Sequence, residues 1–492
     1  MRLTIPAKGR AHDELLETMA GFREGDADYA GGRTWSMVYY VSDAHHAFLE
    51  KAHNLFMAGN ALNPIAFKSL KKMETDVVQM TASMLHGPPD AVGTMTLGGT
   101  ESLLLAVKTY RDLARAKKPW IRRPNMVVPE TIHVAFDKAA HYFGVRMRRA
   151  KVDADGQVDV RAMERLINRN TIFIAASAPQ YPHGTVDPIE ELGALATSHD
   201  LPFHVDACFG GFILPWLERL GVAMPAWDFR VPGVTSVSAD MHKYGYAAKG
   251  ASVLIYRDMN TLRHQFFVAT NWCGGIYISP SLPGTRPGGC IAAAWAAMQA
   301  VGEDGYIALA AKAWEGAERL RAGIAEIDGL RVMGLPHSPV VTWTSDDKAV
   351  DVYAIADRLQ ERGWAVDRQQ KPASVHCSVN ANNLPVIDTY LDDLREAVAH
   401  VKAHPELASE GEAAVYGLMA KIPMRGLVKK EVLKVMEAMY GPGGGDVDLA
   451  ANAKDDKLGA LVRKYGDPIF GALDRAAALR DRAKDKLRMG RR

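Results

Sequence analysis

The feature that most constrains the fold of this chain is a series of short, bounded apolar runs that alternate with helical patterns. The runs have the length of β-strands, and they comprise Met126–Pro129, Thr171–Ala176, Phe203–Cys208, Val234–Ser238 and Ser252–Tyr256. Amphipathic helical patterns separate several of them, and the clearest is Glu101–Lys117. Strands that alternate with helices predict βαβ units and a mainly parallel, buried sheet. We therefore expect an α/β fold.

The same patterns divide the 492 residues into four parts. We expect an N-terminal helical arm over 1–91, a large α/β domain over 92–330, a smaller C-terminal α+β domain over 331–440, and a glycine-rich hinge with a basic helical tail over 441–492. A helical pattern around Ile307–Ile327 and apolar runs at Val340–Trp343 and Ser374–Val379 indicate the C-terminal unit. The stretch Trp272–Gly289, rich in Gly, Pro and Ser, predicts a long ordered loop.

Composition excludes several classes of protein. Apolar residues make up 48% and charged residues 24% of the chain, as in ordinary globular proteins. The net charge of +2 gives no overall argument for a nucleic-acid or membrane partner, although residues 454–492 alone contain 12 basic and 6 acidic residues. The four cysteines have no zinc spacing and HExxH is absent, so no metal site is predicted. Without a signal peptide or an apolar run of about 18 residues, we expect a cytoplasmic protein with no transmembrane segment.

Three segments carry residues suited to chemistry, and each also has a purely structural interpretation. Gly99 and Thr100 precede a helical pattern, where backbone amides can bind an anion or Thr100 can cap the helix. Asp206 ends an apolar run, where it can hold a protonated ring nitrogen or cap the next helix. Lys243 follows a small-residue run that ends near Ser238, where it can form a Schiff base or be a solvated charge.

The order of these three segments favours pyridoxal phosphate as a cofactor. It needs an anion cradle for its phosphate, an acid for its pyridine nitrogen and an amine for its aldehyde. The glycine loop, Asp206 and then Lys243, 37 residues later, supply these groups within one predicted α/β domain. His133 follows another strand end and is suited either to stacking on the ring or to an ordinary loop position.

Several longer segments resemble a known family. They are TLGGTESLLLAVKTYRDLA, APQYPHGTVDPI, HVDACFGGF, VTSVSADMHKYGYAAKGASVLIYR and NWCGGIYISPSLPGTRPGG, and the likeness runs nearly collinearly from residue 28 to 440. The sequence is similar to the sphingosine-1-phosphate lyases, which belong to the group II pyridoxal-phosphate decarboxylases. This resemblance implies the aspartate-aminotransferase fold (fold type I), with a mainly parallel large domain and a smaller C-terminal α+β domain.

The resemblance also implies roles for the cofactor-binding residues. Lys243 would form the Schiff base, Asp206 would pair with the pyridine nitrogen, and His133 would stack on the ring. Gly99, Thr100 and His242 would help to hold the cofactor phosphate. Ser238 is the remaining member of the implied cofactor-binding set.

The implied reaction is a retro-aldol cleavage of the C2–C3 bond of a phosphorylated sphingoid base, which yields a long-chain aldehyde and phosphoethanolamine. The sequence leaves the general base open among Lys243, His242 and Tyr181. The substrate phosphate would be bound by Tyr39, Asn63, Lys249, Thr285 and Arg286. Because members of this family are homodimers with a shared active site, the loop with Thr285 and Arg286 is expected to reach the neighbouring subunit.

The chain departs from the family pattern at three positions near these residues. Asn63 stands where the family has histidine, Leu97 where it has serine, and Ala248 where it has proline. Asn63 can form hydrogen bonds but cannot carry a proton as histidine does. We therefore hypothesise slower turnover, or a related amino-alcohol phosphate as substrate.

Two other functions compete with this interpretation. The nearer one is an amino-acid decarboxylase of the same fold, for which Arg286 could hold an α-carboxylate. The other is a non-enzymatic role, in which the chain binds pyridoxal phosphate as a sensor or acts through its basic tail. A solvated terminal helix explains that tail more simply.

Overall fold

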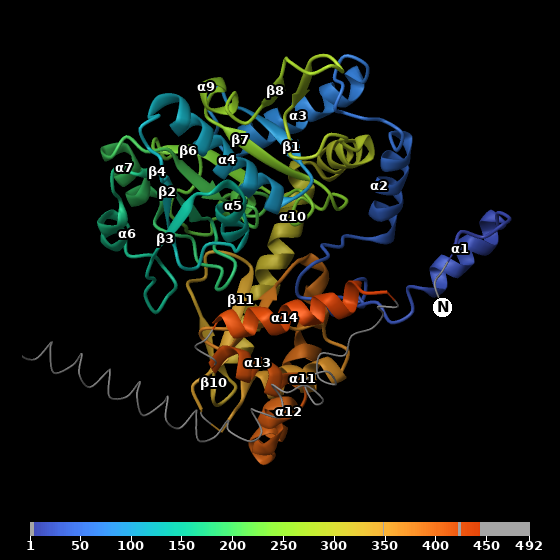
Figure 1. The fold of residues 1–492 in the computed structure, drawn as a ribbon. Coiled ribbons are helices and arrows are strands. Elements are labelled where there is room, and N and C mark those ends of the chain that lie inside the picture. The colour runs from blue at the N-terminus through green and yellow to red at the C-terminus, as the bar shows by residue number, and fades with distance from the viewer. Residues whose placement is uncertain (1–3, 348, 422–424, 443–492) are drawn as a thin grey trace, which may run out of the picture.

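The computed structural model describes residues 4–347, 349–421 and 425–442, and a seven-stranded sheet lies at its centre (Figure 1). The strands are β1 (Val92–Thr96), β2 (Asn125–Pro129), β3 (Arg146–Ala150), β4 (Thr171–Ser177), β5 (Phe203–Asp206), β6 (Val234–Ala239) and β7 (Ser252–Tyr256). Their order in space is β1-β7-β6-β5-β4-β2-β3, and β7 alone in this sheet runs against the others. The predicted α/β fold with a mainly parallel sheet is confirmed.

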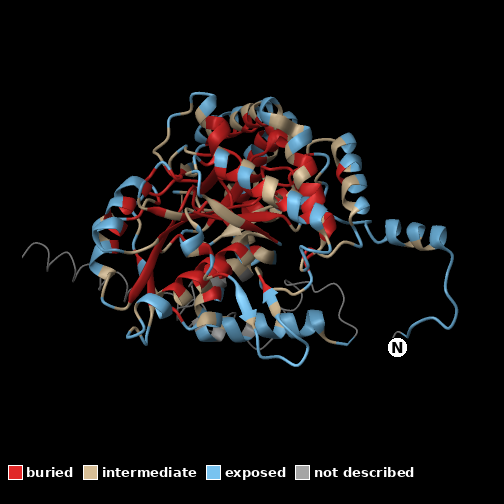
Figure 2. Ribbon diagram, turned by 90° about the horizontal axis from the view of Figure 1, so that it is seen from above, coloured by how far each residue is buried: buried red, intermediate tan, exposed pale blue. Residues whose placement is uncertain are grey.

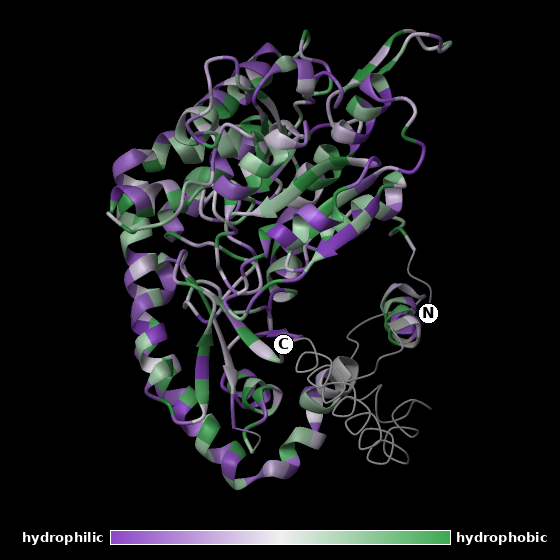
Figure 3. Ribbon diagram, turned by 90° about the vertical axis from the view of Figure 1, so that its left-hand side faces the viewer, coloured by the Kyte–Doolittle hydropathy of each residue, from purple (hydrophilic) through white to green (hydrophobic). Residues whose placement is uncertain are grey.

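Helices cover both faces of this sheet, as the alternation of its side chains requires. Met126 and Val128 of β2 pack into one apolar cluster with α4 (Gly99–Lys117) and α5 (Ala135–Phe143), whereas Val127 between them joins the cluster on the other face. That second cluster includes residues of α3 (Lys68–Met84), α6 (Val160–Leu166), α7 (Ile189–Ser198) and α8 (Leu214–Arg219). Most strands of the sheet are accordingly buried in Figure 2 and apolar in Figure 3.

The chain after residue 329 forms a second layer around its own core. Strands β10 (Leu330–Met333), β11 (Val340–Ser345), β13 (Ser374–Ser378) and β12 (Asp367–Gln369) pair in that order as an antiparallel sheet. Around it lie η1 (Ala381–Val386), η2 (Pro405–Ser409), α11 (Val352–Glu361), α12 (Ile387–Ala403), α13 (Gly411–Lys421) and α14 (Arg425–Tyr440). We call this unit the small domain. The core of this unit includes Trp35 from the N-terminal segment, stacked on Trp364.

The remaining helices join these layers or extend from them. Helix α10 (Gly288–Ala325) contacts α2 and α3 at one end and β10, β11 and α12 at the other, and it kinks at Gly302. The N-terminal arm contains α1 (His12–Gly21) and α2 (Asp43–Leu55). Among the described residues, no helix is long and apolar enough to cross a bilayer. Beyond residue 442, the expected basic tail lies outside the described residues.

The predicted long loop Trp272–Gly289 is only partly a loop. Tyr277–Ser279 forms β9, which pairs with β8 (Phe267–Ala269) in a two-stranded hairpin after the short helix α9 (Met259–Leu262), and Gly288 already belongs to α10. A strand of three residues is too short to give a periodic signal, so the Gly- and Pro-rich composition around it determined the prediction.

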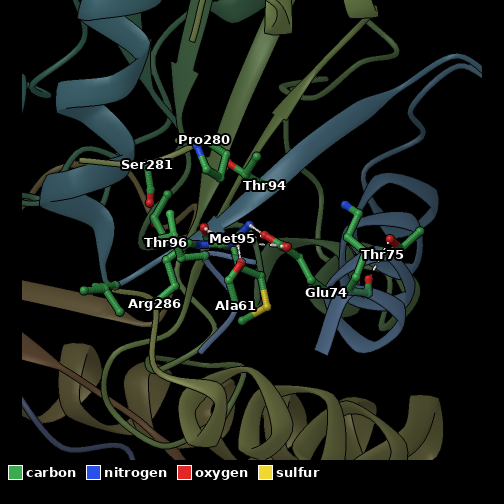
Figure 4. A network of polar contacts seen from close by, with 12 residues as sticks. Ala61, Glu74, Thr75, Thr94, Met95, Thr96, Pro280, Ser281 and Arg286 are labelled. Atoms are coloured by element: carbon green, nitrogen blue, oxygen red, sulfur yellow. Dashed lines mark hydrogen bonds and ion pairs between the residues drawn. The ribbon is translucent and has the colours of Figure 1, made fainter. Parts of the chain in front are cut away.

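A buried ion pair connects the N-terminal helices, the central sheet and the loop before α10 (Figure 4). Arg286 forms a bidentate ion pair with Glu74 of α3, and both side chains are less than a tenth exposed. Arg286 also donates hydrogen bonds to the carbonyl oxygens of Met95 and Ala61, and Glu74 accepts one from the Met95 amide at 3.0 Å. This network, which we call the Arg286 network, therefore fixes three segments to one another.

Replacing Glu74 with Gln is expected to lower the free energy of unfolding by about 3–5 kcal/mol, because it leaves the buried guanidinium without a counter-charge. Urea unfolding followed by circular dichroism measures the change. The matched control is Lys72→Gln on the same helix, whose ion pair with Asp76 is exposed and should contribute much less. Equal losses for the two variants would contradict the central role of the buried pair.

Candidate functional site

Seven of the predicted site residues line one cavity at the carboxyl ends of the parallel strands. The cavity has a volume of about 730 Å³, and these seven are Gly99, Thr100, His133, Tyr181, Asp206, His242 and Lys243. Strands β2, β4, β5 and β6 each end next to one or more of them. The parallel sheet thus assembles residues that are as far as 144 positions apart in the sequence, between Gly99 and Lys243.

The glycine loop leaves the N-terminus of α4 free of capping side chains. The N-cap is Gly98, with φ of 153°, and no side chain caps the helix, so Thr100 is not the N-cap. A Cβ atom at Gly99 would lie only 2.7 Å from Asp240 Oδ2 and 2.9 Å from Cys208 Sγ. The backbone amides at this end therefore remain available to an anion in the cavity.

Asp206 is held at the end of β5 through one of its two carboxylate oxygens. Its Oδ1 accepts hydrogen bonds from the Cys208 amide at 3.1 Å and from the Ser238 hydroxyl at 3.4 Å. Ser238 in turn contacts His204 Nε2 at 3.3 Å. Thus Asp206 holds the turn that follows β5 and lines the cavity, but it does not cap the next helix, because α8 begins only at Leu214 with Ile213 as its N-cap.

Lys243 is not a solvated surface charge. Its Nζ lies 2.9 Å from Oδ2 of Asp240, which is almost completely buried, and 5.5 Å from the centre of the Phe209 ring. Burial alone would lower the pKa of Lys243, but the Asp240 carboxylate and other neighbours raise it well above its ordinary value. Asp240 therefore holds this amine in place and charged.

Two more titratable groups, His242 and Lys249, lie close to Asp240 and Lys243 in the chain. Burial lowers the pKa of His242 to about 4, so its ring is neutral at pH 7. Lys249 donates a hydrogen bond to the His242 carbonyl at 3.1 Å and lies 5.6 Å from the centre of the Tyr39 ring. Burial and the Lys243 ammonium lower the pKa of Lys249 to about 8.

Tyr181 enters the cavity from the loop after β4. Its hydroxyl donates a hydrogen bond to Asp367 at 3.4 Å, and its ring stacks on His376 with centroids 4.2 Å apart. Burial and the Asp367 carboxylate raise the pKa of Tyr181, so the phenol keeps its proton. His133 lies edge-on to Tyr181 at 6.5 Å, and its Nδ1 accepts a hydrogen bond from the Ala135 amide.

The residues predicted to bind a substrate phosphate do not line this cavity. Tyr39 is buried beside Lys249, and its hydroxyl shares a hydrogen bond with Ser378. Asn63 and Thr285 are exposed, and Asn63 Oδ1 accepts hydrogen bonds from the amides of Ile65 and Ala66. Arg286 is paired with Glu74, as described above. Within one chain, the residues predicted to bind the substrate phosphate therefore form two separate groups. Tyr39 and Lys249 make up one group, and Asn63, Thr285 and Arg286 make up the other.

Sequence reasoning missed three polar residues at the site. Asp240 lies in the same motif as Lys243, three residues before it, and that spacing could have suggested an ion pair. Asp367 and His376 belong to the small domain and lie more than 180 residues after Tyr181. No motif or spacing in the sequence indicates that they meet it.

The geometry fits pyridoxal phosphate. An amine, a buried carboxylate and an uncapped helix N-terminus all face a cavity of sufficient size for this cofactor. A side chain at position 99 would clash with Asp240 and Cys208. Because glycine has no side chain, the backbone at this position remains accessible.

Comparison with known proteins gives consistent matches. The model of the pyridoxal-dependent decarboxylase conserved domain matches residues 43–344. The sphingosine-1-phosphate lyase of Arabidopsis thaliana is 43% identical over 445 residues, which cover 89% of this chain and 81% of that protein. Sphingosine-1-phosphate lyase 1 of Rattus norvegicus is 40% identical over 440 residues, which cover 89% and 77%.

Solved structures agree with these matches. The sphingosine-1-phosphate lyase of Burkholderia pseudomallei has a TM-score of 0.78 at 40% identity and covers 86% of this chain and 98% of its own. A glutamate decarboxylase of Lactobacillus brevis has a TM-score of 0.71 at 21% identity, covering 82% and 96%, and shows the fold alone. Together, the domain match and the relatives at about 40% identity show that this chain belongs to the pyridoxal-dependent decarboxylase family and, within it, to the sphingosine-1-phosphate lyases.

Proposed function

We propose that this chain is a pyridoxal-phosphate-dependent lyase that cleaves the C2–C3 bond of a phosphorylated sphingoid base. The products are a long-chain aldehyde and phosphoethanolamine. The observation that carries this proposal is that Lys243, Asp206 and the uncapped N-terminus of α4 face one cavity. The substrate class is supported by the names of the relatives at 36–43% identity.

The cofactor would be held by residues at the strand ends. Lys243 would bind its aldehyde carbon, and Asp206 would hold a proton at the pyridine nitrogen. The backbone at Gly99 and Thr100, together with His242, would bind its phosphate at the positive end of the α4 dipole. Ser238 keeps the Asp206 carboxylate in place, and His133 would cover one face of the ring.

When bound, pyridoxal phosphate joins the substrate amine and accepts the electron pair left on C2 as the C2–C3 bond breaks. The chain must also remove the proton of the 3-hydroxyl group. Lys243, His242 and Tyr181 line the cavity and remain the candidates for this base. His242 is neutral, but its Nδ1 accepts a hydrogen bond from the Ala251 amide at 3.3 Å, whereas Lys243 must first release its proton and its contact with Asp240.

We propose that the substrate phosphate is bound by Tyr39, Asn63, Lys249 and Thr285 of a homodimer with a shared active site. The exposure of Asn63 and Thr285 on one chain supports this arrangement. Hydrogen bonds between Arg286 and the segment before Asn63 hold these two exposed sites near each other. Arg286 would therefore contribute to the phosphate site by anchoring the loop that carries Thr285.

The β8–β9 hairpin supports the same homodimer. It projects from the top of the molecule in Figure 1, and its large apolar side chains are more than half exposed. These side chains are Phe267, Val268, Trp272, Ile276 and Ile278. An element that exposes this many large apolar side chains is typical of a protein–protein interface. We also propose a cytoplasmic location, since the four cysteines are free thiols.

The decarboxylase alternative loses its main candidate residue. It requires a cation for the α-carboxylate, and Arg286 was the residue suggested for that role. The Arg286 guanidinium is buried and already paired with Glu74. Lys249, which has the Tyr39 ring beside it, is better placed for a phosphate.

The cofactor and the reaction can be tested on the purified protein. The wild type should show the visible absorbance band of lysine-bound pyridoxal phosphate and release aldehyde from sphingosine 1-phosphate. Lys243→Ala should lose both, whereas Lys151→Ala, a surface lysine paired with Glu130, should lose neither. A missing band in the wild type would refute the cofactor. A band with carbon dioxide release from amino acids, and no aldehyde, would favour the decarboxylase.

The role of Lys249 predicts a specific pH dependence. Its ammonium is charged below a pKa of about 8 and loses its charge as the pH rises through that value. Phosphate binding, and with it kcat/KM for the phosphorylated substrate, should therefore fall above pH 8. Lys249→Arg stays charged and should retain more of its kcat/KM there. Parallel pH profiles of the two proteins would contradict this assignment.

Because Asn63 stands where the family has histidine, we expect a variant with histidine at this position to be more active. Asn63→His should raise kcat on sphingosine 1-phosphate by about 10-fold, because it restores a group that can carry a proton or a charge near the phosphate. Asn63→Gln, which restores no such group, is the matched control. Both variants lose the hydrogen bonds to Ile65 and Ala66, so any difference between them reports the imidazole. No gain over the wild type would remove the argument from Asn63.

A further inference from the structure

Two polar residues of the small domain meet at one aromatic residue of the cavity. Asp367 on β12 and His376 on β13 are direct partners across the two antiparallel strands. Directly opposed residues of such a pair present their side chains on the same face of the sheet. Both side chains contact Tyr181, which enters from the large domain, so the contact joins the two parts of the molecule.

His376 contributes a buried, neutral ring. It has no exposed surface, its ring plane is inclined by 27° to that of Tyr181, and its centroid is 6.5 Å from that of Phe209. Burial lowers the pKa of His376 to about 3, so the ring packs without charge. Within the described chain, no side chain forms a hydrogen bond with either ring nitrogen. Of the two rings, Tyr181 is the nearer, with its centroid 4.2 Å from that of His376.

Asp367 orients the hydroxyl group of the Tyr181 phenol. The Tyr181 hydroxyl donates to Asp367 Oδ2, so its hydrogen points away from the other groups of the cavity. The phenol oxygen then keeps lone pairs with which it can accept a hydrogen bond from a hydroxyl group in the cavity. Phe209, whose ring lies against Tyr181, also lies beside Lys243. The phenol and the amine of Lys243 thus share Phe209 as a neighbour and line the same cavity.

We propose that Asp367 and His376 are positioning residues that fix the ring and the hydroxyl direction of Tyr181, so that its oxygen accepts a hydrogen bond from the substrate 3-hydroxyl group. The inference rests on the proposed lyase function and assigns the small domain a part in it. His376 limits the tilt of the ring, and Asp367 limits the rotation of the hydroxyl. Their contribution acts through Tyr181, since neither residue lines the cavity.

Asp367→Asn is the first test. It keeps the size of the side chain but replaces the carboxylate, so kcat should fall by about 10- to 100-fold, as expected when a reacting group is misplaced. KM and the absorbance band of the bound cofactor should stay within twofold of the wild type. Asp367→Glu should recover part of kcat. The matched control is Asp346→Asn, an exposed small-domain aspartate paired with Arg331, which should not alter kcat.

A double-mutant comparison separates positioning from general damage. If Asp367 acts through the phenol, Asp367→Asn should reduce kcat less than twofold in a Tyr181→Phe background. The same should hold for His376→Leu. An unchanged kcat in Asp367→Asn, or an equal fall in both backgrounds, would overturn the proposal.

Urea unfolding of the full chain gives a readout that does not depend on the reaction. The losses of stability in Asp367→Asn and Tyr181→Phe should be smaller in combination than their sum, because both variants act on the same hydrogen bond, which Asp367→Asn weakens and Tyr181→Phe removes. Additive losses would overturn the inference even in an active enzyme. If the wild type releases no aldehyde but the losses are not additive, the contact stands and the proposed function fails.

Discussion

The buried ion pair between Glu74 and Arg286 is the contact on which the arrangement around the cavity depends. It is costly to desolvate two charges, so such a pair persists only where further hydrogen bonds satisfy it. Here the carbonyl oxygens of Met95 and Ala61 and the amide of Met95 do so. Since β1 leads from Met95 directly into Gly98, the position of the N-terminus of α4 follows from this network (Figure 4).

The same network determines where the small domain lies relative to the cavity. Helix α10 begins two residues after Arg286 and packs against elements of both layers. Direct hydrogen bonds then lock the layers together, from the Tyr244 hydroxyl to the Val379 carbonyl at 2.7 Å and from the Thr342 hydroxyl to the Pro182 carbonyl at 2.6 Å. Pro182 is the neighbour of Tyr181, and Thr342 is paired with His376 of β13, which explains how β13 reaches Tyr181.

The sequence predicted those elements that are buried on both sides and missed those at the edges. Strands β2, β4, β5, β6 and β7 coincide with the expected apolar runs to within two residues at each end. The edge strands β1 and β3 were not expected, because one is rich in Gly and Thr and the other contains three arginines. Edge strands of this kind avoid pairing with other chains, and the same property removes their apolar signal.

The site shows a similar limit. Asp206 and Lys243 could be identified because each closes a recognisable strand, whereas the partners of Tyr181 come from a distant part of the chain. Arg286 illustrates the opposite error that a sequence invites. An arginine in a Gly- and Pro-rich loop suggests an anionic ligand, but in this structure its counter-charge is a carboxylate of the protein itself.

The distribution of charge around the cavity explains how a nearly neutral chain can favour a phosphorylated substrate. Of the two lysines in the motif, Lys243 is neutralised by Asp240, while no carboxylate in the described chain lies within ion-pair distance of Lys249. Burial, and after it the neighbouring Lys243 ammonium, lower the pKa of Lys249. A phosphate would supply the missing counter-charge and raise that pKa again. With Asn63 unable to carry a charge, phosphate affinity at the proposed site would rest more heavily on Lys249 than it would with a histidine at position 63.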